Sequence, residues 1–334
     1  MAGPPITLAA ALRDCDHANP RVRDKALRHM GDALLAELGP KTKRWRAADR
    51  HPRGAQVIEV LTEAVHSDPS PVLQGFAAIG LGQLGHPLAL PLLREALGTE
   101  GEGEEPAFRR ECAAIGLAEL AGAAMEDPAA ALLPAIAAPL ADGLASPHPE
   151  VRFQCSGTLV DVLGNDAEEP IAKALAHESN AEVRRGLCEA LARIDHPSPT
   201  TTEQLRAVLE DTAVDLDTRF AAAIGLTAAR DPAAAPILLK GLGKPEFRNR
   251  ALEALAALGA LAPTEAIPKI RALASSWLRP RVTRVRAAYA LARIRPGEGE
   301  RLLERFGHSR SAAVQEAVAD ARAALKSLAA RERE

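Results

Sequence analysis

Aromatic residues are scarce in this chain of 334 residues, which has only 2 Trp, 1 Tyr and 6 Phe. A β-sandwich draws on aromatic and β-branched residues, so this composition argues against an all-β fold. The sequence also lacks an uncharged apolar run of about 18 residues, which argues against a transmembrane helix. The first residues, MAGPPITLAAALRD, lack the basic start of a secretory signal peptide. What is present is 47% hydrophobic, rich in alanine and leucine, and suited to closely packed helices.

The four cysteines (Cys15, Cys112, Cys155 and Cys188) are few and scattered. They form no Cys-x-x-Cys pair and have no zinc-ligand spacing with histidine, so we expect no metal and no cofactor. Three of them fall at nearly the same place in a repeating unit, where small buried side chains are expected. Unpaired thiols without an export signal predict a cytoplasmic protein.

One local pattern recurs along the chain: a turn, often with proline, then Val or Phe, usually Arg, and then a run rich in Ala and Leu. Copies include NPRVRDKAL, HPEVRFQCSGTL, NAEVRRGLCEAL and KPEFRNRALEAL, and the string AAIGL occurs three times. Their spacing indicates a basic period of about 32 residues with insertions, which is typical of stacked repeats. The first apolar residues of the six clearest copies are Val22, Val72, Phe108, Val151, Val183 and Phe247.

Each copy predicts a helical hairpin. The recurring segment carries apolar residues at helical spacing, and a second helical pattern precedes it, as in residues 86–97 and 231–242. Short turns with Gly, Pro, Asp or His separate the two helices. Because one hairpin cannot bury its apolar stripe alone, neighbouring hairpins must stack. We therefore predict an all-α fold, an α-solenoid of about nine hairpins forming a right-handed superhelix or arc.

Proline-containing motifs connect this repeat with a known family. Asp-Pro or His-Pro begins first helices, proline recurs inside those helices, and PEVR or PEFR begins second helices. These motifs resemble HEAT-repeat proteins, especially the short bacterial HEAT-like repeats also found in bilin lyases. The resemblance spans almost the whole chain and implies that the second helices line a concave face. It says little about function, since this fold supports many unrelated roles. The residues that carry it are Asp231-Pro232, His86-Pro87, Pro91, Pro236 and Pro268.

Two adjacent positions at the start of the second helices are candidates for specific contacts. The first carries arginine in several copies, and these arginines either bind an anionic ligand or pair with carboxylates and turn carbonyls of nearby repeats. They are Arg23, Arg109, Arg152, Arg184 and Arg248. The next position points away from the apolar stripe, and we predict a partner-binding ridge there, with an exposed aromatic residue as a potential hot spot. The ridge consists of Arg110, Phe153, Arg185, Arg219 and Asn249.

Charge is unevenly distributed behind the overall net charge of −3. Residues 1–54 carry +5, residues 55–270 carry −15, and residues 271–334 carry +7. Each basic end contains a cluster that either contacts phosphate groups, with a tryptophan available for stacking, binds an acidic protein patch, or is simply solvated. The first cluster is Lys41, Lys43, Arg44, Trp45 and Arg46, and the second is Arg279, Arg281, Arg284 and Arg286.

Three segments depart from the repeat within a single predicted solenoid domain, residues 1–334. Residues 38–54 are predicted to form a basic insertion loop, and the Gly-rich and Glu-rich residues 98–106 an acidic loop. Residues 310–334 are predicted to form a C-terminal capping helix with a polar end. Such departures matter because loops often carry function.

Signatures of catalysis are lacking, since the chain has no GxxxxGK[ST], GxSxG or HExxH. HEAT-like deoxyhypusine hydroxylases hold iron with repeated His-Glu pairs, and this sequence has one such pair, His177-Glu178. A HEAT-like DNA glycosylase or lyase is the enzymatic alternative, although the acidic centre of the chain argues against a DNA groove. We therefore predict a non-catalytic scaffold or adaptor that binds a protein partner through its concave face. The alternative is nucleic-acid binding through the two basic clusters.

Overall fold

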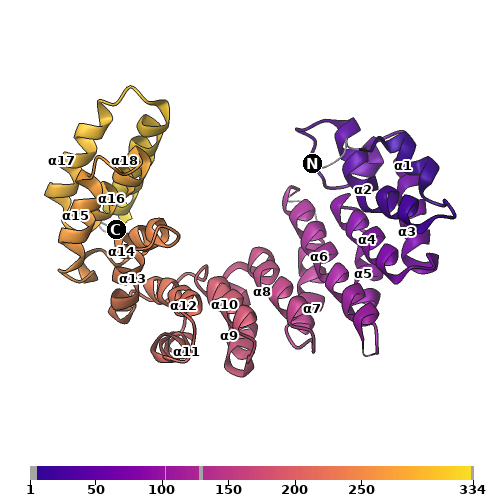
Figure 1. Cartoon of the computed structure of the whole chain (residues 1–334), viewed down its shortest axis with the longest axis horizontal. Helices are drawn as coiled ribbons and strands as arrows, with labels where there is room; N and C mark the ends of the chain where they lie inside the picture. Colours follow the sequence, from indigo (N-terminus) through magenta and orange to yellow (C-terminus); the bar gives the residue numbers. More distant parts are fainter. Residues whose placement is uncertain (1–5, 102, 128–130, 332–334) are drawn as a thin grey trace. The chain divides into compact units, whose positions relative to one another are not determined.

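The computed structural model describes residues 6–101, 103–127 and 131–331, and these residues form helices, turns and loops without a strand. Packing divides the chain into two compact units, Met1–Leu187 (unit 1) and Cys188–Glu334 (unit 2). Figure 1 shows the helices following one another as hairpins within each unit. Residue 102 of the predicted acidic loop and residues 332–334 of the predicted capping helix lie outside the described residues.

Unit 1 consists of helical hairpins in which the second helices also pack on one another. Proline begins several of these second helices, where its missing N–H costs no helical hydrogen bond. Contacts join α2 to α4, α4 to α6 and α6 to α8. The hairpins are α1 (Leu8–Asp14) with α2 (Pro20–Leu38), α3 (Gly54–Ser67) with α4 (Pro71–Gln83), α5 (Ala89–Leu97) with α6 (Glu104–Met125), and α7 (Leu133–Gly143) with α8 (Pro149–Leu163), followed by α9 (Glu168–His177) and the start of α10 (Ala181–Leu191).

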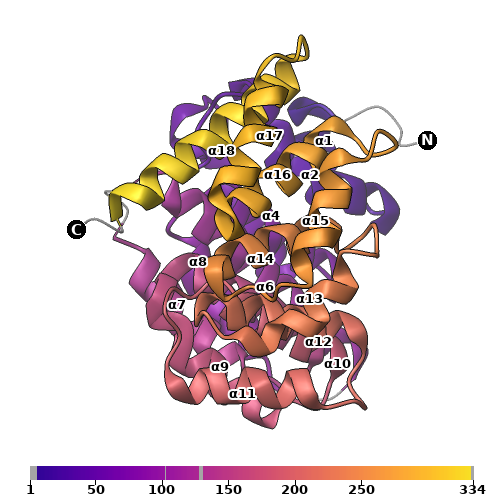
Figure 2. The ribbon, with the colours of Figure 1, turned by 90° about the vertical axis from the view of Figure 1, so that its left-hand side faces the viewer.

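Unit 2 continues the same arrangement, with contacts from α12 to α14, α14 to α16 and α16 to α18. Figure 2 gives a second view of its last helices, and α16 contacts α15, α17 and α18. Together the two units confirm the predicted α-solenoid of helical hairpins. The hairpins of unit 2 are α11 (Pro199–Glu210) with α12 (Leu216–Ala228), α13 (Ala235–Gly241) with α14 (Arg248–Leu258), α15 (Ala266–Ser275) with α16 (Arg281–Ile294), and α17 (Pro296–Gly307) with α18 (Ala312–Arg331).

Small residues let helices approach closely in unit 1. A Cβ atom added to Gly82 of α4 would lie 2.2 Å from the carbonyl oxygen of Gly116 in α6, so these two backbones are nearly in contact. Only glycine fits such an approach without displacing a helix. The recurring AAIGL string therefore serves helix packing, because Gly116 is the glycine of its second copy.

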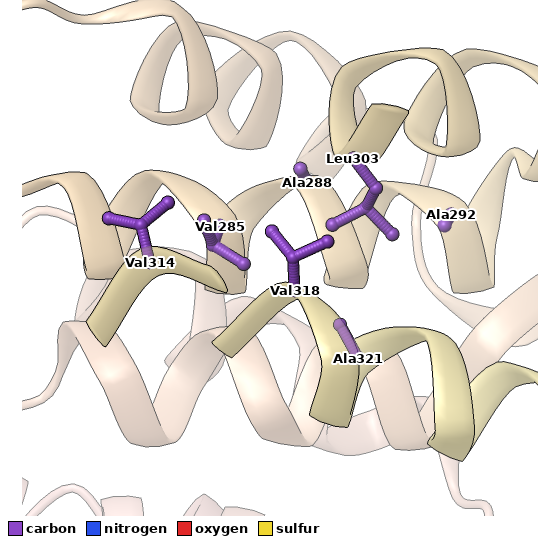
Figure 3. Close-up of a cluster of buried hydrophobic side chains, with 7 residues drawn as sticks. All are labelled: Val285, Ala288, Ala292, Leu303, Val314, Val318 and Ala321. Atoms are coloured by element: carbon purple, nitrogen blue, oxygen red, sulfur yellow. The ribbon is translucent and has the colours of Figure 1, made fainter. Parts of the chain in front are cut away.

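The last hairpins of unit 2 close around a cluster of buried side chains (Figure 3). Val314 and Val318 of α18 lie against α16 and α17, and Leu303 of α17 is 1% exposed. Burying a Val or Leu side chain contributes about 1.5–3 kcal/mol, so this cluster anchors α18. The members are Val285, Ala288, Ala292, Leu303, Val314, Val318 and Ala321.

Two of the segments that depart from the repeat connect consecutive helices of unit 1. The basic loop joins α2 to α3 and contains the short 3-10 helix η1 (Ala47–Arg50). The acidic loop is shorter than predicted, since Glu104 and Glu105 form the first turn of α6. Negative charge is favourable there because the N-terminus of a helix carries a partial positive charge. Three further 3-10 turns are η2 (Gly164–Ala167), η3 (Pro232–Ala234) and η4 (Gly259–Leu261).

Candidate protein-binding surface

Near the start of most second helices, a side chain donates to backbone carbonyls at the end of the preceding helix or in the turn that follows it. In unit 1, Nη1 of Arg152 donates to the carbonyl oxygen of Ser146 at 2.8 Å. In unit 2, Nε of Arg219 donates to that of Leu209, also at 2.8 Å. Carbonyls at a helix C-terminus lack partners within the helix, and a positive charge is favourable there. These donors are Arg23, Gln74, Arg110, Arg152, Arg219, Arg248, Arg284 and Gln315.

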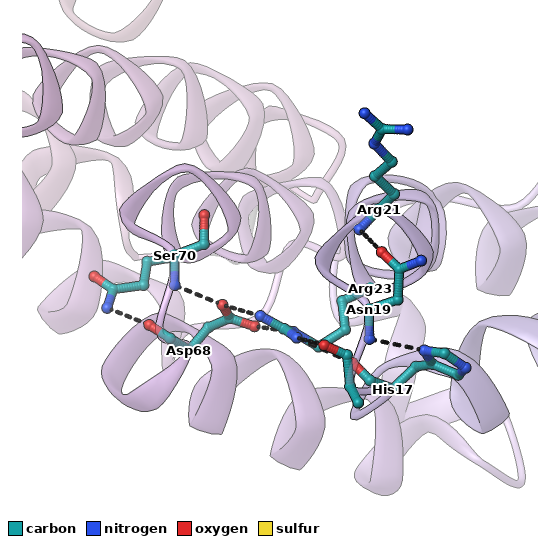
Figure 4. A network of polar contacts seen from close by, with 8 residues as sticks. His17, Asn19, Arg21, Arg23, Asp68 and Ser70 are labelled. Carbon is teal, nitrogen blue, oxygen red and sulfur yellow. Dashed lines mark hydrogen bonds and ion pairs between the residues drawn. The ribbon is translucent and has the colours of Figure 1, made fainter.

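Arg23 also links two hairpins through a carboxylate (Figure 4). Its Nε and Nη2 donate to the two carboxylate oxygens of Asp68 at 2.9 and 3.1 Å. Asp68 is 5% exposed and additionally accepts the backbone N–H of Ser70 at 2.8 Å. A bidentate pair of this kind fixes geometry as well as contributing energy. Arg23 therefore pairs with a carboxylate of a neighbouring repeat, which is one of the two roles that the sequence allowed for these arginines.

The pair formed by Arg152 and Glu178 repeats this arrangement. Nε and Nη2 of Arg152 donate to Glu178 at 2.7 and 2.8 Å, and Glu178 accepts the backbone N–H of Asn180. Burial alone raises the pKa of the Glu178 carboxyl, but the bonds from Arg152 and from backbone N–H groups outweigh burial and hold that pKa below its usual value. The carboxylate is consequently charged and fully bonded at neutral pH.

Two predicted ridge residues occupy this donor position. Arg110 is only 8% exposed and donates to the carbonyl oxygens of Thr99 and Gly101, while Arg219 bonds Leu209 as described above. In α6 the donor Arg110 lies two residues after the apolar anchor Phe108, whereas in α8 the donor Arg152 directly follows its anchor Val151. The residue after the donor in α6 is Glu111, which the sequence analysis missed.

Phe153 is the ridge residue that the structure places at an exposed surface. It is 38% exposed, and one edge of its ring lies on α10, where a Cβ atom added to Gly186 would be 2.8 Å away. Beside it lies a cavity of about 180 Å³ between the starts of α8 and α10 and the face of α6. Three carboxylate residues line this cavity, so its surroundings are acidic. The lining residues are Glu111, Ile115, Pro149, Glu150, Phe153, Gln154, Asn180, Glu182 and Val183.

The remaining ridge residues lie apart from this cavity lining. Nη2 of Arg185 is 3.5 Å from a carboxylate oxygen of Glu182, one of the residues that do line it. Asn249 is half-buried in the first turn of α14 and belongs to unit 2. Phe153 and Arg185 therefore belong to unit 1, and Asn249 belongs to unit 2.

Residues of the first basic cluster form ion pairs and hydrogen bonds within unit 1. Arg44 forms ion pairs with Glu119 and Glu126 of the α6 end, and its backbone N–H donates to Glu126. Nζ of Lys43 donates to the carbonyl oxygen of Glu126 at 3.0 Å. These contacts join residues about 80 positions apart in sequence and attach the basic loop to α6. Carboxylates thereby neutralise the charge of Arg44, whereas Lys43 bonds a carbonyl oxygen and keeps its charge.

Other residues of this cluster also form contacts within unit 1. Arg46 pairs with Asp49 in the same loop, and the carbonyl oxygen of Trp45 accepts a bond from Arg50 at 2.9 Å. Trp45 is half-buried, and Lys41 is exposed. Only part of the Trp45 side chain is therefore available for stacking.

The second basic cluster adjoins an exposed apolar turn that the sequence analysis missed. Trp277 is 83% exposed and Leu278 is 72% exposed, between α15 and α16. Arg279 and Arg281 follow and are also exposed. Exposed aromatic residues beside arginine are typical of binding surfaces. The available signal was a tryptophan, one of only 2 in the chain, in a turn between predicted helices.

The other members of the second cluster have partners. Nε of Arg284 donates to the carbonyl oxygen of Ala274 at 3.1 Å, and its guanidinium lies 5.1 Å from the ring centre of Phe306. Arg286 is 3.9 Å from Glu253. Arg284 is therefore fixed in place, while Arg286 has one weak ion pair at the surface.

Burial governs the chemistry of the cysteines. It raises the pKa of Cys112 and of Cys155 to about 12, so both thiols are protonated and poorly nucleophilic at neutral pH. Among the described residues, no three His, Cys, Asp or Glu side chains are grouped so as to hold a metal ion. In the same part of the chain, no helix combines the length and apolarity needed to cross a membrane.

Sequence comparison places this repeat within a family. A family model described as HEAT repeats matches residues 6–104, 58–152, 137–217 and 168–259. These overlapping matches cover more than half of the chain. The chain belongs to the HEAT-repeat family. Among curated proteins, none matches this HEAT-repeat protein significantly.

Solved structures agree with the HEAT-repeat fold. YibA of Escherichia coli is 15% identical, with a TM-score of 0.59 over 86% of this chain and 92% of YibA. Kap121p bound to Nup53p is 11% identical, with a TM-score of 0.54 over 93% of this chain and 36% of Kap121p. This protein thus spans about a third of the length of Kap121p. At these identities the likeness shows the fold alone.

Proposed function

We propose that this HEAT-repeat protein is a non-catalytic cytoplasmic scaffold that binds a protein partner through the surface around Phe153. The observation that carries the proposal is a partly exposed aromatic ring bordered by Glu111, Glu150 and Glu182, beside a cavity large enough for one side chain. Kap121p, which shares the fold, is a protein-binding solenoid in its complex with Nup53p. Buried, protonated thiols and an acidic surface fit a binding role better than nucleophilic catalysis.

The chemistry of this surface suggests what it binds. Three carboxylates around an aromatic face favour a partner arginine or lysine, which can stack on the ring and pair with the glutamates. Flanking residues of the partner then extend over the neighbouring second helices, because a stable interface needs about 800 Å² from each protein. The nucleic-acid alternative gains no support from the comparisons, and Arg44 of its first cluster is paired with Glu119 and Glu126.

Affinity capture from native lysate tests this proposal with three proteins: the wild type, Phe153→Ala and Leu88→Ala. Leu88 is 55% exposed in unit 1 at the start of α5, away from the Phe153 cavity, and serves as the control. A nuclease-resistant partner should be retained by the wild type and Leu88→Ala, and weakened about 30-fold by Phe153→Ala, as expected for an aromatic hot spot. Equal retention by all three proteins contradicts the assignment, and loss of every partner with nuclease favours nucleic acid.

A further inference from the structure

Unit 2 contains a second candidate site, a cavity of about 520 Å³ formed by the last two hairpins. It lies where the end of α15 and the start of α16 meet the end of α17 and the start of α18. Figures 1 and 2 draw these helices in orange and yellow. This volume is in the range of small-molecule pockets. The lining residues are Ala274, Ser275, Arg281, Arg284, Leu302, Arg305, Phe306, His308, Ser309, Arg310 and Val314.

The charge of this cavity has one sign. Four arginines line it, and no carboxylate is among the described residues that do so. Arg281, Arg305 and Arg310 take part in none of the ion pairs found within the described chain, and all three are exposed. Several unpaired guanidinium groups around one cavity create a strong positive potential that attracts anions.

One arginine of the cavity is held in place by the fold. Arg284 donates through Nε to the carbonyl oxygen of Ala274 and lies over the Phe306 ring, so its outer Nη groups keep a defined position. Such positioning lowers the ordering cost of ligand binding. Leu302, Phe306 and Val314 add an apolar wall.

We propose that this cavity binds a phosphomonoester whose organic part lies on that apolar wall. A phosphomonoester near neutral pH carries close to two negative charges and three acceptor oxygens, which suits several guanidinium forks. A ligand with a single carboxylate would leave most of the positive charge of the cavity unpaired. The volume exceeds what inorganic phosphate alone would fill, so the apolar wall is available to an organic group. This site is independent of the Phe153 surface.

Calorimetric titration of the full chain with phenyl phosphate, inorganic phosphate and benzoate tests this proposal. Phenyl phosphate should bind at least about 10-fold more tightly than benzoate, which has the same ring and a single charge, and more tightly than inorganic phosphate. Arg305→Ala should weaken phenyl phosphate about 10-fold, because it removes a charge-assisted hydrogen bond. Arg301→Ala, one turn earlier on α17 and outside the lining, should change binding less than 2-fold.

A second pair on α16, Arg281→Ala against Arg286→Ala, repeats this comparison, and thermal melts check that all four variants fold. Equal effects within each pair, or equal binding of benzoate and phenyl phosphate, would overturn the proposal. A phosphoserine peptide that binds more tightly than phenyl phosphate identifies a phosphorylated polypeptide as the source, and weaker peptide binding identifies a small organophosphate. Binding of a single-stranded oligonucleotide without binding of phenyl phosphate would also overturn it.

Discussion

The two units use the same position of their second helices in different ways. In unit 1, Arg23 and Arg152 each reach a carboxylate of the next hairpin, and both carboxylates are almost fully buried. In unit 2, Arg219, Arg248 and Arg284 donate to carbonyls of their own hairpin and form no ion pair within the described part of the chain. Two arginines of unit 1, Arg23 and Arg152, therefore join neighbouring hairpins, whereas Arg110 of unit 1 and the three arginines of unit 2 bond within single hairpins.

The carboxylates of the two joints in unit 1 lie at the same place, directly after a first helix. Asp68 and Glu178 directly follow α3 and α9, in an extended backbone conformation that turns the side chain toward the preceding hairpin. Ser276 has the same place and a similar conformation after α15, but it has no charge. The residue at the end of the first helix thus supplies the carboxylate of these two joints, whereas Asp211 holds the same place after α11 and forms no ion pair within the described residues.

The largest expected effect comes from breaking a joint of unit 1. Glu178→Ala should lower the free energy of unfolding by about 3 kcal/mol, because it leaves the Arg152 guanidinium without its partner in a largely buried setting. Urea denaturation measures this change. The control Glu182→Ala removes a carboxylate that is 71% exposed and should cost less than about 0.5 kcal/mol. Equal losses in the two variants would mean that the buried pair has no special role.

The same joint predicts a pH dependence. The pKa of Glu178 is lower in the folded than in the unfolded chain, so its stabilising contribution is present above the usual glutamate pKa and is lost as pH falls through the folded value. Relative to Glu178→Gln, the wild type should be more stable by about 2 kcal/mol at pH 7, and the difference should shrink below about pH 4.5. Parallel urea titrations from pH 7 to pH 3 check this. A difference that stays constant with pH would contradict the charged pair.

Much of the fold could be predicted from the sequence because its signals are local. The same signals recur from hairpin to hairpin: proline at helix starts, glycine and aspartate in turns, and apolar residues at helical spacing. The repeat period and the pairing of helices could therefore be predicted. The surface was less predictable. In α6 the donor lies two residues after the anchor Phe108 and not one, which is why Arg110 was placed on the ridge and Glu111 was overlooked.

Contacts between distant segments were not predictable from local patterns. In the sequence, the basic loop is a cluster of positive charge without nearby carboxylate partners. Arg44 forms ion pairs with Glu119 and Glu126 because the fold places the end of α6 beside the loop. The cavity of unit 2 likewise combines Arg281 with Arg305 and Arg310 from the following hairpin. In both cases the sequence shows the charges, and the fold decides whether they are paired.

The smallest expected effect comes from transferring the joint to unit 2. Ser276→Asp places a carboxylate at the position that Asp68 and Glu178 occupy, next to the hairpin of Arg248. Arg248 is 8% exposed, and burial together with nearby Arg279 lowers its pKa, so a new negative charge should stabilise it. We expect a gain of up to about 1 kcal/mol in urea denaturation, because the guanidinium must share its carbonyl bonds with the new partner. Ser276→Asn has the same shape without the charge and should give no gain. If both variants behave alike, the carboxylate after the first helix does not by itself join hairpins, and the difference between the units has another origin.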